Sequence, residues 1–127
     1  MTGRRAPRSV PFSTVRKFAL ALPDVEESTA YGAPAFKLRG RLVACTATNK
    51  AAEPNTLVVC IDFPDRDALI EEQPDIYYLK DHYVDYACVL VRLSRVHPDA
   101  LRDLLRAGWA FANSKAPRKG RRRGPMV

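Results

Sequence analysis

Long apolar segments are missing from this sequence of 127 residues. No apolar run approaches the roughly 20 residues that a membrane-crossing helix needs. The short apolar run at 18–22 follows two cationic residues and ends at Pro23, so it is too short for the core of a secretory signal. We therefore expect a cytoplasmic protein with no membrane partner.

Cysteine is scarce, and its spacing excludes the common disulfide and metal patterns. The sequence has three cysteines and no CxxC motif. Each lies in an apolar, strand-like segment; they are Cys45, Cys60 and Cys88. Free cysteine is among the most buried residue types. We expect three reduced thiols that act as small core residues.

Patterns typical of enzymes are also missing. The sequence has two histidines, and it lacks a Gly-rich phosphate loop, a GxSxG elbow and an HExxH motif. Spacing alone leaves a pair of Cys88 and His82 open, but a thiol in an apolar strand is normally inert. His97 directly precedes a proline and is typical of a helix start. We expect no enzyme activity and no cofactor.

Acidic residues are missing from both ends of the chain. Residues 1–12 carry three arginines, and residues 115–127 carry six cations. The net charge of +7 therefore comes entirely from the ends, because residues 13–114 hold all fourteen acids and are slightly acidic. Segments rich in Arg, Pro and Gly bury too little apolar surface to become ordered alone. We expect basic disordered tails at 1–12 and 116–127 around one domain at 13–115.

The spacing of apolar residues within that domain predicts an α+β fold. Helices are expected from an N-cap at Ser13 to Pro23, then at 64–73 and 97–114. Strands are expected within 24–48, over 56–63 and, once or twice, within 76–93. Short loops join consecutive strands, so the sheet should be antiparallel, with the terminal helices packed on one face. Gly108 costs about 1 kcal/mol inside a helix, which indicates close packing against the sheet.

A tight hairpin is expected within the first group of strands. Arg39, Gly40 and Arg41 are predicted to form a three-residue loop with Gly40 at a positive φ. Four apolar residues then share one face of the hairpin, and Lys37 lies on the other face near Val43 and Cys45. The four are Phe36, Leu38, Leu42 and Ala44.

Three segments resemble the MmcQ/YjbR-like family over residues 13–118. They are "LPDVEESTAYGAPAFKLRGRLVA", "HYVDYACVL" and "LRDLLRAGWAFANSKAPRK". The resemblance implies a frataxin-like (CyaY-like) α+β fold and a DNA-binding protein with a "double wing" motif.

Three groups of residues could contact DNA. The hairpin offers Lys37, Arg39 and Arg41, because arginine can bind phosphate or guanine bidentately. The segment near the second bend offers Lys80, His82 and Tyr83, which combine phosphate contact with stacking. The C-terminal end offers Lys115, Arg118, Lys119, Arg121, Arg122 and Arg123. We expect weak, largely non-specific binding to the phosphate backbone.

Other interpretations remain open from the sequence. The hairpin could be an ordinary polar turn, and alternating tyrosines often pack within a sheet. A protein-interaction module would expose a sheet face that carries Tyr77, Tyr83 and Tyr86. A small-molecule or metal-binding domain is a third possibility. The acidic group of Asp24, Glu26 and Glu27 falls short of a metal site, although either glutamate could pair with the hairpin arginines.

Overall fold

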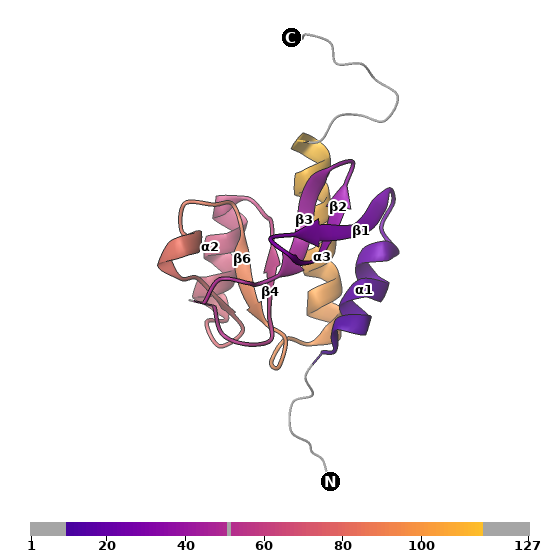
Figure 1. The fold of residues 1–127 in the computed structure, drawn as a ribbon. Helices are drawn as coiled ribbons and strands as arrows, with labels where there is room; N and C mark the ends of the chain where they lie inside the picture. Colours follow the sequence, from indigo (N-terminus) through magenta and orange to yellow (C-terminus); the bar gives the residue numbers. More distant parts are fainter. Residues whose placement is uncertain (1–9, 51, 116–127) are drawn as a thin grey trace.

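A six-stranded antiparallel sheet carries three α-helices on one of its faces in the computed structural model, which describes residues 10–50 and 52–115 (Figure 1). The strands lie in the order β1-β2-β3-β4-β6-β5. The elements are α1 Phe12–Leu20, β1 Val25–Ala30, β2 Ala33–Leu38, β3 Arg41–Thr46, β4 Thr56–Val59, α2 Phe63–Glu72, β5 Tyr77–Tyr78, the 3₁₀ helix η1 Asp81–Tyr83, β6 Val89–Arg92 and α3 Pro98–Lys115. This arrangement confirms the α+β class and the terminal helices on one face.

The folded part begins before residue 13. Val10 is buried, and its N–H donates to the carbonyl of Leu93 at 2.7 Å. The helix α1 then begins at Phe12, with Pro11 as its N-cap, so the expected cap at Ser13 is wrong. The extended backbone of Pro11 places its carbonyl to accept from Thr14 N–H, so the helix is capped two residues earlier than expected. Residues 10–12, which we expected in the tail, therefore belong to the fold.

The hairpin between β2 and β3 is tighter than expected. Leu38 pairs with Arg41, which leaves only Arg39 and Gly40 in the turn. Both have a positive φ, 47° and 86° respectively. Two such residues match the right-handed twist of the flanking strands. The prediction for Gly40 is confirmed, but Arg41 belongs to the strand and not to the loop.

A register shift changes which side chains of β3 face the helices. The pairing steps from Lys37↔Leu42 to Phe36↔Ala44, so one extra residue of β3 stands opposite β2. Because one extra residue reverses the alternation of faces, Val43 joins the helix-side core, while Leu42 packs on the opposite face. The expectation that Leu42 shares a face with Phe36 is therefore wrong.

The main core lies between the sheet and the helices. Its largest fully buried side chains come from the strands and from α3 and include Phe36, Leu38, Leu101 and Leu105. Gly108 of α3 lies against the sheet, where an added Cβ would be 3.0 Å from Val59 Cγ1 and 3.2 Å from the Cys60 carbonyl oxygen. The predicted close approach at Gly108 is confirmed.

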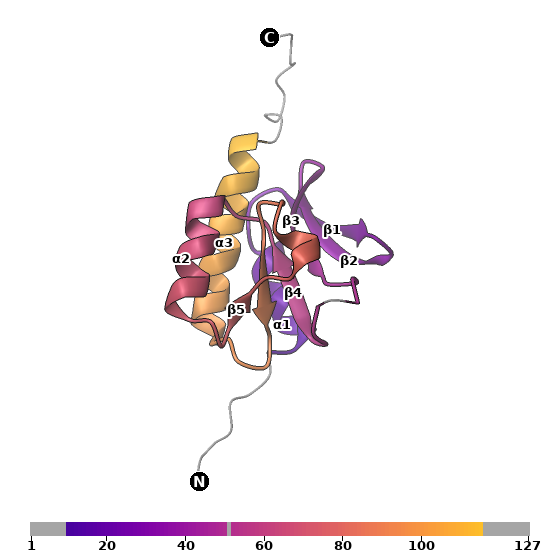
Figure 2. The same ribbon diagram turned by 90° about the vertical axis from the view of Figure 1, so that its left-hand side faces the viewer.

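A smaller apolar cluster lies on the other face of the sheet. It contains Ala35, Cys45, Val58, Tyr78, Tyr83, Cys88 and Leu90. This face is covered by residues 47–50 and 52–55 and by the segment 80–88, which includes η1, and α2 and α3 lie on the far side of the sheet (Figure 2). We call it the open face.

Candidate binding groove on the open face

A groove of about 800 Å³ crosses the open face where β3 and β4 separate. Ladder pairing of these strands ends at Ala44↔Val59, followed by one hydrogen bond from Cys60 N–H to the Val43 carbonyl at 3.0 Å. Ile61 N–H then donates to the Ala87 carbonyl at 3.1 Å. The chain after β4 thus turns away from β3 toward the segment before β6, and the space between them is the groove. We call it the open-face groove.

The lining of the groove is mainly apolar and includes all three cysteines. Burial raises the pKa of Cys45 to about 11, that of Cys60 to about 12 and that of Cys88 to about 11. A thiol with so high a pKa stays protonated near neutral pH and is a poor nucleophile. The prediction of free thiols is confirmed, with Cys60 only partly buried because it lies at the groove. The thiols therefore contribute a neutral, polarisable wall.

The basic groups at the groove are Arg41 and His82, and no acidic residue is found among its described lining. Arg41 is exposed at the start of β3. Within residues 10–50 and 52–115 its guanidinium has no hydrogen bond or ion pair. An arginine left unpaired beside an acid-free groove can bind an anion.

One buried arginine holds the segment that forms one wall of the groove. Arg66 of α2 is 8% exposed. Its Nη1 donates to the carbonyls of Val84 and Tyr86 at 2.9 and 3.0 Å, and its Nε donates to Asp67 Oδ1 at 2.9 Å. The guanidinium also lies 4.7 Å from the ring centroid of Phe63. Arg66 therefore fixes the backbone beside His82 and Tyr86 while leaving their side chains available.

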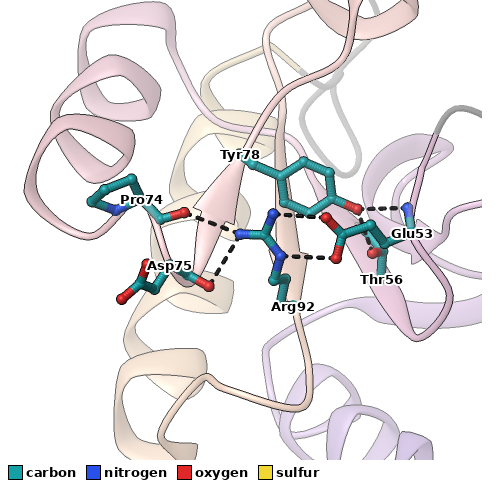
Figure 3. A network of polar contacts seen from close by, with 6 residues as sticks. All are labelled: Glu53, Thr56, Pro74, Asp75, Tyr78 and Arg92. Carbon is teal, nitrogen blue, oxygen red and sulfur yellow. Dashed lines mark hydrogen bonds and ion pairs between the residues drawn. The ribbon is translucent and has the colours of Figure 1, made fainter.

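A second arginine connects the other wall to the sheet. Arg92 of β6 makes a bidentate pair with Glu53, at 2.9 and 2.7 Å, and donates to the carbonyls of Pro74 and Asp75 (Figure 3). Its guanidinium lies 4.2 Å from the centroid of the Tyr78 ring. Its hydrogen bonds to Glu53 hold the pKa of that carboxyl below its usual value.

The hydroxyl of Tyr78 completes this network. It accepts from Glu53 N–H at 2.8 Å and shares a hydrogen bond with Thr56 Oγ1 at 2.6 Å (Figure 3). Residues 52–55 are therefore held, through Glu53, by main-chain and side-chain bonds to two strands. Both walls of the groove are fixed by hydrogen bonds to the sheet or to α2.

The two arginines of the hairpin lie in different environments. Arg39 donates to Asp24 Oδ2 at 2.9 Å and to the side chain of Asn113, so it connects the turn to the segment before β1 and to α3. Arg41 lines the groove. Lys37 is half-buried on β2 opposite Glu26, and its charge acts on Cys45 as expected, whereas Val43, which was expected near it, lies in the helix-side core. Of the three predicted hairpin residues, Arg41 is at the groove.

The three residues predicted to contact DNA near the second bend differ in how far they are buried. Tyr83 is buried, and its hydroxyl is hydrogen-bonded to the Asn49 backbone. His82 is exposed and packs edge-on to the Tyr83 ring, with centroids 4.9 Å apart. Lys80 is exposed, with its Nζ 5.9 Å from the Tyr78 ring centroid. Tyr83 is buried except where it lines the groove, so contacts with a large molecule such as a duplex at this bend would come from Lys80 and His82.

The predicted tyrosine-bearing sheet face does not form. Tyr77 packs in the helix-side core, whereas Tyr83 belongs to the cluster on the open face and Tyr86 is 59% exposed. The two-residue alternation of a strand would place Tyr77 and Tyr83 on the same face of the sheet only if one regular strand joined them. A short strand followed by η1 replaces it. Tyr31, at the turn between β1 and β2, is a further exposed tyrosine at the groove.

The acidic group before and within β1 is used in ion pairs. Asp24 pairs with Arg39, and Glu27 pairs with Arg16 of α1 through two hydrogen bonds of 2.8 and 3.1 Å. The acidic residue that pairs with the hairpin is therefore Asp24, and not Glu26 or Glu27 as expected. Among the described residues no group of three or more His, Cys, Asp or Glu could hold a metal ion.

The cationic C-terminal residues fall mostly beyond the described ranges. Lys115 ends α3, with its ammonium 5.6 Å from the ring centroid of Phe111, which lines the groove. The other predicted residues of this group lie outside the described residues; they are Arg118, Lys119, Arg121, Arg122 and Arg123. The cationic segment thus follows directly from the groove end of α3.

Comparison with known proteins agrees with the resemblance found in the sequence. The YjbR family model matches residues 20–111, which is most of the chain. The chain belongs to the YjbR family. A crystal structure of the Deinococcus radiodurans protein DR2400, which has a DUF419 domain, is similar with a TM-score of 0.68 and 20% identity. The match covers 89% of this chain and 84% of that one.

These comparisons fix the family and the fold of this YjbR-family protein. No curated protein matches it. None of the helices in the described ranges is both long enough and apolar enough to span a bilayer.

Sequence reasoning missed Arg66 and Arg92. Apart from Asp67, which is next to Arg66 in the chain, their hydrogen-bond partners are backbone carbonyls and a glutamate that lie 17 to 39 residues away. The only signal in the sequence was the position of each arginine, one in a helix and one at the end of an apolar strand. An arginine at such a position must either reach solvent or find several acceptors.

Proposed function

We propose that this YjbR-family protein binds DNA weakly and without sequence preference, mainly through phosphate contacts. The observation that carries the proposal is the distribution of charge. Residues 13–114 are slightly acidic, and nine cations without any acid lie in residues 1–12 and 115–127. Such cationic segments bind polyanions by releasing condensed counterions, which requires no base contact.

The described residues support a second, positioned contribution. Arg41 lines the groove, Lys37 lies on the neighbouring strand, and Lys80 is exposed beyond β5. Lys115 lies at the end of α3, near the same end of the molecule as the hairpin turn (Figure 1). In this proposal the chain ends provide attraction, and the free cations of the open face orient the body on the duplex.

A salt series with a labelled duplex tests the proposal by fluorescence polarisation. If about six phosphates are neutralised, the logarithm of affinity should fall with the logarithm of salt with a slope near −5. Replacing Arg118, Lys119, Arg121, Arg122 and Arg123 by glutamine should reduce the slope to about −1. A full-length protein that binds no duplex at low salt would refute the proposal.

The glutamine variant also separates the chain end from the folded body. Its control replaces the exposed Arg102 and Arg106 of α3 by glutamine, which removes charge on the helix side. That control should keep the wild-type slope. A reduction of slope in the control in proportion to its two lost charges would mean that net charge, and not the chain end, drives binding.

A further inference from the structure

The chemistry of the open-face groove does not suit a phosphate backbone. Its interior is formed by Leu42, Val58 and the three cysteines, which cannot solvate a string of phosphates. A pocket of this size, lined mainly by apolar side chains with a few polar groups at fixed positions, is typical of sites for small organic molecules. The proposed DNA binding therefore gives no role to the apolar lining of the groove.

The charge of the groove lining favours a negatively charged ligand. Arg39, Arg66 and Arg92 are each occupied by carboxylates, amides or carbonyls. Arg41 alone of these four lines the groove, and within the described residues it has no hydrogen bond or ion pair. With no acid among the described lining residues, the lining itself offers an anion attraction and no opposing charge, and the exposed Asp81 and Asp85 lie outside it.

The shape of the groove favours a planar body. Aromatic rings of Tyr31, Tyr83, Tyr86 and Phe111 lie around it, and His82 packs against both Tyr83 and Tyr86. Rings of this kind stack on flat ligands. Arg66 and Arg92 fix the two walls, so little ordering is needed on binding, and a preformed site loses less affinity to entropy.

We infer that the open-face groove binds a small organic anion with a planar apolar body, such as an aromatic carboxylate or sulfonate, with Arg41 pairing to its charged group. The thiols and Val58 contact the body, and the tyrosines stack on its faces. This inference does not depend on DNA binding: it shares Arg41 with the proposed phosphate contacts, but it rests on the apolar, acid-free lining of the groove.

Two fluorescent probes of nearly equal shape test the inference on the full chain. Anilinonaphthalene sulfonate carries the negative charge, and phenylnaphthylamine is its uncharged counterpart. The variants are Arg41→Ala, Arg41→Lys and, as a matched control on the helix side, Arg106→Ala. Arg106 is exposed on α3 and is not among the residues that line the groove.

Losing a charge-assisted contact should weaken binding of the sulfonate by about tenfold or more in Arg41→Ala. Arg41→Lys should recover part of the loss because it restores the charge but not the planar fork. The uncharged probe should bind the wild type more weakly, and its affinity should change by less than about twofold in Arg41→Ala. Arg106→Ala should match the wild type with both probes.

Amide chemical shifts locate the bound sulfonate independently of the variants. Signals of Cys45, Val58 and Tyr86 should move on titration, whereas those of Leu101 and Leu105 should stay in place. Three results would overturn the inference: shifts confined to other surfaces, sulfonate binding that is indifferent to Arg41, or equal affinity for the charged and uncharged probes. Failure of the duplex titration would leave these expectations unchanged.

Discussion

The face of the sheet under the helices is filled by large side chains, whereas the open face combines large side chains with several small and polarisable ones. Phe36, Leu38 and Leu101 are completely buried on the helix side. The open face carries Ala35, three cysteines and Val58 beside the larger Tyr78, Tyr83 and Leu90. Large side chains fill the space between layers, but small ones under two loops leave a groove. The same sheet thus holds the fold together on one side and offers a binding surface on the other.

The largest difference in the free energy of unfolding should be found between two leucine-to-alanine variants in one hairpin. Leu38→Ala removes a fully buried side chain from the helix-side core and should cost about 2–5 kcal/mol in the free energy of unfolding. Leu42→Ala, on the groove side, should cost about 1 kcal/mol or less because its side chain is already partly exposed. Urea unfolding of both variants measures the difference. Equal costs would mean that the two faces contribute alike to stability.

A smaller effect is expected at the clamp between α2 and the groove wall. Arg66→Ala should cost about 1–3 kcal/mol because it leaves the carbonyls of Val84 and Tyr86 without their donor. Amide hydrogen exchange should rise in the segment 80–88 and stay unchanged in β2. Arg66→Lys is the matched control, since it keeps the charge but cannot reach both carbonyls with one planar group. Unchanged exchange at 80–88 would contradict the role assigned to Arg66.

The second wall should respond to loss of a single hydroxyl. Tyr78→Phe removes two hydrogen bonds and leaves the buried Thr56 hydroxyl without its partner, at a cost of about 1 kcal/mol. The ring that supports Arg92 remains. Thermal unfolding measures the loss. Thr56→Val in the same background should add little further loss, because the two residues act through one shared bond.

Replacing a groove thiol should change the free energy of unfolding least at neutral pH. The change should become larger only in alkali. Burial raises the pKa of Cys60 from 9.0 to about 12. Its protonated form stabilises the fold fully below pH 9, and this contribution disappears as the pH rises toward 12. Cys60→Ala should therefore lose less stability than the wild type between these two pH values. Parallel pH profiles in chemical denaturation would argue against a buried thiol.

Local sequence rules predicted the elements but not the use of each charged residue. Gly40 and Gly108 were predictable because a positive φ and a close approach leave glycine as the natural residue. The face of Leu42 was not, since a single extra residue in β3 reverses the alternation. Arg39 and Arg41 look equivalent in the sequence. Only the folded chain places Asp24 and Asn113 around one and the groove around the other.

This contrast within one turn gives the most direct test of the account. The salt dependence of duplex binding should be measured for Arg39→Ala and Arg41→Ala beside the wild type. Loss of one phosphate contact in Arg41→Ala should lower the magnitude of the slope by about 1. The slope of Arg39→Ala should equal that of the wild type, although its thermal stability falls. Equal slopes for the two variants would contradict the division between a structural and a binding arginine.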